Sequence, residues 1–204
     1  MEGIKNIIFD LGGVLLNIDY NRTSEAFKKL GAGDFDSFYS QQGANQLFEE
    51  LETGNISETD FYSEMQKHCY PNTTIAQIQA AWNAILLDFR EESLRFLKTL
   101  NDHYSLFLLS NTNSIHLSEF DKIFTRQTGN SNFNDLFSKA YYSHLIHKRK
   151  PYPSTYLFIL EDAGISAEET LFIDDSKNNI EGADEAGLKT HWLKPGERIE
   201  LLPL

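Results

Sequence analysis

The chain has 204 residues, of which 41% are hydrophobic and 24% charged, the balance of an ordinary globular protein with a core of its own. Its 30 acidic and 18 basic residues give a formal net charge of -12, which argues against nucleic acid or an anionic membrane surface as a partner. One cysteine excludes an intramolecular disulfide and no apolar run approaches the roughly 20 residues that span a bilayer, so we expect a soluble cytoplasmic protein.

Four short apolar runs predict buried strands, at residues 6–9, 105–109, 140–143 and 170–173. Helical patterns separate the runs, so the order of elements favours an α/β protein with a Rossmann-like parallel sheet. Each run is followed by polar or charged residues. Because ligands of open α/β sheets bind beyond the carboxyl ends of the strands, we expect these four polar clusters to meet at one site.

The stretch 17–89 has a different character. Apolar residues recur in it at helical spacing, no part of it reads as a strand, and Ser57 with Asp60 resembles a capping box. We therefore predict a core domain of residues 1–16 and 90–204 and an inserted, all-helical cap of residues 17–89. The turn from Glu52 to Asn55 joins two helices of this cap and can approach the substrate, although loop chemistry alone also explains its residues. Extra helices on the flank of the sheet are the alternative to a cap.

The first polar cluster places Asp10 directly after a strand and before Gly12 and Gly13. A carboxylate on such a turn is exposed, and backbone amides can approach a ligand beside it. A plain turn at the end of a strand explains the same residues equally well, so the remaining clusters must decide between the two interpretations.

The second cluster contains Ser110 and Asn111, a hydroxyl and an amide that can donate hydrogen bonds to phosphate oxygens. Helix capping also explains this sequence. His116, a few residues later, can reach the rim of the same site, and a capping or surface position explains it as well.

The third cluster, residues 147–150, is the most basic stretch of an acidic chain. A phosphate site in such a chain needs local positive charge, which this stretch supplies. Pro151 and Pro153 stiffen the backbone after Lys150, and this suits a positioned ammonium group better than a mobile one. Taken alone, the stretch is also compatible with a solvated loop.

The fourth cluster begins with Asp174 and Asp175 after an apolar strand. Two adjacent carboxylates repel each other unless a cation lies beside them. Oxygen ligands without a nearby cysteine or histidine favour a hard ion, magnesium first, although acids are also common at the start of a helix.

In this order the four clusters resemble the signature motifs of the haloacid dehalogenase-like (HAD) hydrolases, and the resemblance covers essentially the whole chain. It implies that Asp10 is a nucleophile, that Ser110 and Lys150 bind phosphate, and that Asp174 and Asp175 bind metal. The position of the cap, between the first and second clusters, resembles the helical C1 type of the superfamily. Among its branches, the chain looks most similar to bacterial sugar phosphatases, such as those that act on α-glucose 1-phosphate.

The resemblance implies that the chain hydrolyses a small phosphorylated metabolite, a phosphate monoester, through an aspartyl-phosphate on Asp10. It implies Mg²⁺ as the cofactor, held by the carboxylates of Asp10, Asp174 and Asp175 and the backbone carbonyl of Gly12. The phosphate and substrate contacts that it implies come from Leu11, Gly12, Ser110, Asn111 and Lys150, with His116 at the rim. Oligomeric state is not predicted.

Gly12 departs from the pattern of the superfamily, because most of its phosphatases carry a general acid, an aspartate, at this position. Loss of a proton donor costs about 10²–10⁴-fold in rate. A cap residue, Asp19 or an ordered water can replace it, or the leaving group can need less protonation. The alternatives are a non-catalytic phosphate-binding module and a 2-haloacid dehalogenase, a branch that also lacks this aspartate. Asp174 and Asp175 argue against the dehalogenase because they would repel its carboxylate substrate.

Overall fold

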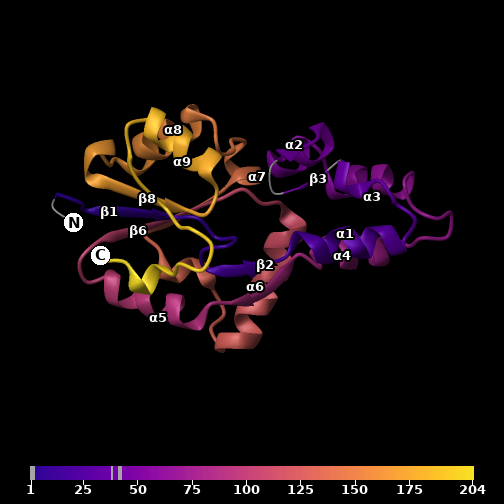
Figure 1. Ribbon diagram of the computed structural model, residues 1–204, viewed down its shortest axis with the longest axis horizontal. Helices are drawn as coiled ribbons and strands as arrows, with labels where there is room; N and C mark the ends of the chain where they lie inside the picture. Colours follow the sequence, from indigo (N-terminus) through magenta and orange to yellow (C-terminus); the bar gives the residue numbers. More distant parts are fainter. Residues whose placement is uncertain (1–2, 38, 41–42) are drawn as a thin grey trace.

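The computed structural model describes residues 3–37, 39–40 and 43–204, so parts of the predicted core and cap segments, at 1–2, 38 and 41–42, lie outside the described residues. Its main sheet has five parallel strands in the order β7-β6-β1-β8-β9 (Figure 1). In chain order these are β1 (Asn6–Phe9), β6 (Ser105–Ser110), β7 (Lys139–Tyr142), β8 (Thr170–Asp174) and β9 (Lys189–Trp192). The predicted parallel α/β sheet is confirmed, with β9 as an additional strand at one edge.

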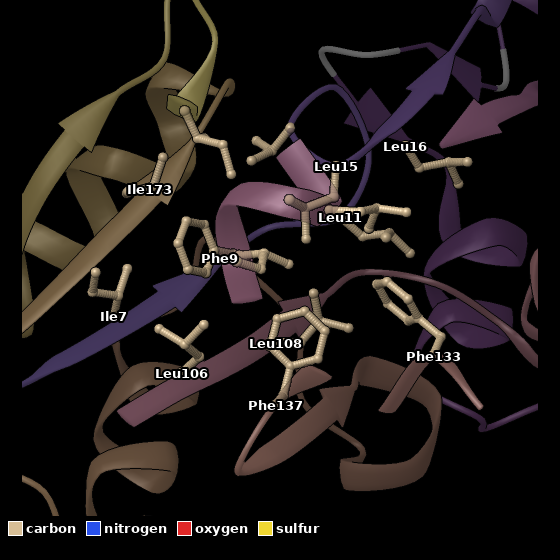
Figure 2. Packing of buried hydrophobic residues seen from close by; sticks show 14 of the residues in the cluster. Ile7, Phe9, Leu11, Leu15, Leu16, Leu106, Leu108, Phe133, Phe137 and Ile173 are labelled. Atoms are coloured by element: carbon tan, nitrogen blue, oxygen red, sulfur yellow. The ribbon is translucent and has the colours of Figure 1, made fainter. Parts of the chain in front are cut away.

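Helices cover both faces of this sheet. Alternate side chains of β1 point to opposite faces, so Ile7 and Phe9 belong to one hydrophobic cluster and Ile8 to another. Figure 2 shows Ile7 and Phe9 beside Leu106 and Leu108 of the neighbouring strand. The first cluster is covered by α5 (Glu91–Leu100) and α6 (Ser114–Thr128), the second by α8 (Pro153–Ala163) and α9 (Lys177–Glu185).

Four helices of the insertion lie together at one end of the molecule, on the right in Figure 1. They are α1 (Tyr20–Lys29), α2 (Gln46–Glu52), α3 (Glu58–Gln66) and α4 (Ile75–Asn83). They share a further hydrophobic cluster, which Ile115 of α6 joins, and in it Phe48 and Phe61 contact the fully buried Trp82 at ring distances of 5.2 and 5.4 Å. The expected capping box is present, since the Ser57 hydroxyl accepts from the Asp60 amide at 3.1 Å.

The insertion also contains strands, so the prediction of an all-helical segment was wrong in this respect. The strand β2 (Leu16–Ile18) pairs antiparallel with β5 (Leu86–Phe89), and β3 (Tyr39–Ser40) pairs with β4 (Gly43–Ala44). Residues 86–87 continue the apolar pattern of α4, and periodicity alone cannot separate so short a strand from a helix. The predicted domain boundaries fall within β2 and directly after β5, and the division into two domains stays a prediction.

Short helical segments complete the chain: η1 (Phe35–Ser37), η2 (Phe133–Leu136), α7 (Ser143–Ile146), η3 (Ala167–Glu169) and η4 (Ile199–Leu201). Within the described ranges, no helix combines the length and apolar character that crossing a membrane requires.

Candidate active site

Three carboxylates meet at the carboxyl ends of β1 and β8. These strands are neighbours in the sheet, and one oxygen from each of Asp10, Asp174 and Asp175 lies within 4.8 Å of the others. The turn after β1 approaches them closely, because a Cβ on Gly13 would lie only 2.2 Å from Asp175 Oδ2, and Gly13 has a φ of +76°. Both features exclude a side chain at this position. The convergence expected from the strand ends therefore occurs for these acids.

Lys150 lies among the carboxylates. Its side chain is 1% exposed, and Nζ donates hydrogen bonds of 2.6 Å to both Asp10 Oδ1 and Asp174 Oδ2. Asn111 holds the backbone of Lys150 on both sides, since its Nδ2 donates to the lysine carbonyl at 3.0 Å and its Oδ1 accepts from the lysine amide at 2.9 Å. The side chain of Asn111 thus positions Lys150. Only the backbone amide of Asn111 is then left for the predicted contact with phosphate.

Further hydrogen bonds fix the positions of Asp174, the last residue of β8, and of Asp175, which follows it. Asp174 Oδ1 accepts from the Ser176 amide at 2.7 Å, and the Asn179 side-chain amide donates to both oxygens of Asp174 at 3.1 and 3.0 Å. The indole of Trp192 donates to the carbonyl of Asp175 at 3.0 Å. The geometry of the cluster is therefore built into the fold before any ligand binds.

The charges of this cluster are not balanced by the protein. Burial, together with the neighbouring carboxylates, raises the pKa of Asp10 to about 8 and that of Asp175 to about 6, although Lys150 opposes both shifts. Burial lowers the pKa of Lys150, but Asp10 and Asp174 outweigh it and raise that pKa overall. A divalent cation would remove this excess of negative charge, and oxygen-only ligands suit a hard ion.

A cavity of 340 Å³ opens beside Asp10 and is lined by the core and the insertion together. Gly12, Asn111, Lys150 and Asp175 of the predicted site lie on its wall. Sequence reasoning missed several other lining residues, namely Tyr20, Tyr39, Glu49, Arg149, Asn178 and Asn179. Two lining residues, Glu52 and Arg149, lie in segments that the sequence analysis had noted. Glu52 begins the turn between the two cap helices, and Arg149 belongs to the basic stretch.

Comparison with known proteins decides the family. The family model described as "haloacid dehalogenase-like hydrolase" matches residues 4–187. The chain is a HAD-like hydrolase. The family resemblance and the prediction that the chain is an enzyme are thereby confirmed.

Among its relatives, a D-ribitol-5-phosphate phosphatase of Bacteroides thetaiotaomicron is 33% identical over 92% of this chain and 90% of its own length. A mutant of the HAD family enzyme BT-2542 of the same species, crystallised with magnesium and inorganic phosphate, superposes with a TM-score of 0.89 at 36% identity over 96% of both chains. A HAD-like hydrolase of Porphyromonas gingivalis gives a TM-score of 0.85 at 32% identity over 95% of this chain and 93% of that one.

Four residues predicted for this HAD-like site are not among the described residues that line its cavity: Leu11, Ser110, His116 and Asp174. Asp174 is fully buried and contacts Lys150 behind the cavity wall. Ser110 is the last residue of β6 and is 3% exposed. Leu11 is 3% exposed and packs in the sheet cluster, so only its backbone can serve a ligand. The suggested substitute acid, Asp19, instead caps α1 by accepting from the Asn21 amide at 3.0 Å.

His116 is buried between the HAD core and the insertion and is not among the described residues that line the cavity, so the structure does not support the expected rim position. Its ring stacks on Trp82 with centroids 4.5 Å apart, and Nε2 lies 3.2 Å from the Trp82 carbonyl. Its Nδ1 lies 3.2 Å from Asn113 Nδ2. Asn113 caps α6, which turns His116 toward the insertion. This histidine therefore joins the two parts of the chain.

The buried His116 makes stability depend on pH. Burial lowers its pKa to about 4, so the folded protein holds it neutral while the unfolded chain protonates near its ordinary value of 6.5. As pH falls from 6.5 to 4, the free energy of unfolding should fall by on the order of 3 kcal/mol from this residue. The contribution of His116 is measured by urea unfolding as a function of pH, with magnesium present, for the wild type and the His116→Gln variant. Equal pH slopes for the two proteins would contradict the assignment.

Proposed function

We propose that the protein is a Mg²⁺-dependent phosphatase that hydrolyses a small sugar or polyol phosphate through Asp10. The observation that carries this proposal is the position of the Asp10 carboxylate on the cavity wall, bonded to Lys150 and beside two further acids. The magnesium and phosphate of the BT-2542 complex and the name of the ribitol-phosphatase relative support it. Asp10, Asp174, Asp175 and the carbonyl of Gly12 would hold the metal.

In the proposed reaction, a carboxylate oxygen of Asp10 attacks phosphorus and the bond to the ester oxygen breaks, leaving an aspartyl-phosphate. The electron pair departs with the ester oxygen, which takes up a proton. Water then attacks phosphorus, releases phosphate and restores the carboxylate. Lys150 neutralises a phosphate oxygen and keeps Asp10 oriented. Bound Mg²⁺ supplies the charge that lets a carboxylate approach an anionic phosphate.

Gly12 leaves the source of that proton to other groups. A Cβ at this position would lie 3.0 Å from Ile18 Cδ1, so an aspartate here requires Ile18 to move by a few tenths of an ångström. Of the substitutes considered, the insertion contributes Glu52 to the cavity wall, whereas Asp19 is engaged at the start of α1. An alcohol that leaves readily, as from an anomeric carbon, would need the least help.

Metal removal tests this proposal. We expect phosphate release from a panel of sugar 1-phosphates, sugar 5- and 6-phosphates, polyol phosphates and an aryl phosphate to require Mg²⁺. Chelation should lower phosphate release by about 10²-fold or more, with recovery on adding Mg²⁺, because three clustered acids, two of them buried, would otherwise repel a phosphate dianion.

Two outcomes would overturn the proposal. Metal-independent halide release from 2-haloacids, without phosphatase activity, would assign the chain to the dehalogenase branch. Binding of Mg²⁺ and phosphate without turnover of any ester would indicate a binding module.

A further inference from the structure

The cavity wall is acidic on the side of the insertion. Four carboxylates line the described cavity, from Asp10, Glu49, Glu52 and Asp175, against two cationic side chains, those of Arg149 and Lys150. Lys150 is committed to the acids of the core. The charge available to a leaving group therefore depends on Arg149.

Arg149 is already neutralised by the insertion. Its Nη2 lies 2.9 Å and its Nε 3.0 Å from Glu52 Oε2, and Nη1 binds Glu49 Oε1. The side chains of Arg149 and Glu52 are only 15% and 9% exposed. Thr155 donates a hydrogen bond of 2.7 Å to the carbonyl of Arg149 and holds its backbone. A guanidinium with two carboxylate partners in a partly buried site has little attraction left for a third anion.

The turn after Glu52 is held against the core, and this keeps the carboxylates of Glu49 and Glu52 beside Arg149. His147 Nδ1 lies 2.8 Å from the Thr53 carbonyl. Gly54 adopts a φ of +69°, and a Cβ there would lie 2.3 Å from the carbonyl of His144. The close contact of turn and core requires glycine and sets the position of Glu52 beside the cavity.

We propose that Glu49 and Glu52 determine specificity, because they occupy Arg149 and select neutral, hydroxyl-rich leaving groups over those that carry a carboxylate or a second phosphate. The inference rests on the proposed phosphatase function. The hydroxyls of Tyr20 and Tyr39, whose rings lie 5.6 Å apart on the same wall, and the Glu52 carboxylate offer donors and acceptors to a polyol. An anionic leaving group meets two carboxylates and no free cation among the described lining residues, which is selection by repulsion.

A matched pair of substrates tests this inference: a pentitol 5-phosphate, and the aldonic acid 5-phosphate that differs from it by a carboxylate at the far end. Wild type should favour the pentitol phosphate in kcat/KM by about tenfold or more. Glu52→Gln and Glu49→Gln should each move this ratio toward the acid, and the double variant by about tenfold or more. Arg149→Gln should move it the other way, since both glutamates then lose their counter-charge.

Glu50→Gln is the matched control. Glu50 lies on the same helix, accepts a hydrogen bond of 2.7 Å from Gln46 and does not line the cavity, so the ratio should stay at the wild-type value. Glu49→Gln serves if Glu52→Gln does not fold, because the Glu49 side chain is 40% exposed.

The outcomes separate the inference from the function on which it rests. Failure of wild type to hydrolyse even an aryl phosphate with Mg²⁺ would overturn the phosphatase itself. Hydrolysis of the aryl phosphate with equal preference for the two pentose derivatives, or a ratio that the glutamate variants leave unchanged, would overturn the specificity role alone.

Discussion

An Asp10→Asn variant is expected to lose phosphate release by roughly 10⁴-fold or more while keeping its fold. The amide cannot attack phosphorus, so no aspartyl-phosphate forms and only the binding groups remain. The substitution is nearly isosteric, and it removes a carboxylate whose charged form is disfavoured by burial and by Asp174 and Asp175 more than Lys150 favours it, as its raised pKa shows. Without metal, the unfolding temperature should therefore equal or exceed that of wild type.

Acid quenching of the enzyme with labelled substrate should trap phosphate on wild type and not on the variant. Asp102→Asn is the matched control, because Asp102 lies on an exposed turn before the amino end of β6, whereas the site lies at the carboxyl ends of the strands. Turnover by Asp10→Asn within tenfold of wild type would contradict the nucleophile assignment.

The site residues at the ends of the strands were predictable from the sequence, because each polar cluster directly follows a recognisable strand or basic stretch. Asp10 and Asp174 follow apolar strands directly, and the pairing of β1 with β8 then brings them together whatever the surface helices do. Lys150 is reached by the same reasoning, since it comes from a basic stretch after another strand. Sequence reasoning therefore found the charged centre of the site.

The wall contributed by the insertion was not predictable in the same way. Arg149 is 97 residues from Glu52 and 100 residues from Glu49, and no local pattern pairs them. His116 shows the complementary difficulty. Its sequence position near Ser110 suggested the site, but the rotation of α6 about its axis, set by the Asn113 cap, turns the ring toward Trp82.

Short strands at the base of the insertion were missed for an energetic reason. Phe89 is fully buried against Phe124 and Phe133 of the core, at ring distances of 5.3 and 5.0 Å. This tertiary contact, together with the pairing of β5 with β2, ends the helical pattern of α4 early. Burial of this kind outweighs the small differences in local propensity that a sequence window measures.

Lys150→Met should have the second large effect, on both activity and stability. Within the described structure, its Nζ is the cation bonded to Asp10 and Asp174, both buried. Removing one partner of a buried ion pair costs about 3–5 kcal/mol. Turnover should fall by about 10³-fold, since one neutralising contact to the phosphate and the orientation of Asp10 are both lost. Lys148→Met is the matched control: Lys148 lies over the Phe158 ring at 5.6 Å, and its loss should cost less than about 1 kcal/mol.

The pH dependence of unfolding distinguishes this electrostatic role from simple packing. The folded pKa of Asp10, about 8, lies above its unfolded value of 3.8, so without metal its contribution to stability is present at low pH and is lost as pH rises toward 8. Removing the ammonium should raise that pKa further and steepen the loss, whereas Lys148→Met should leave the slope unchanged. Mg²⁺ should flatten the slope in wild type and restore part of the stability of Lys150→Met. A Lys150→Met protein with the wild-type slope and no response to Mg²⁺ would show that the lysine only fills space.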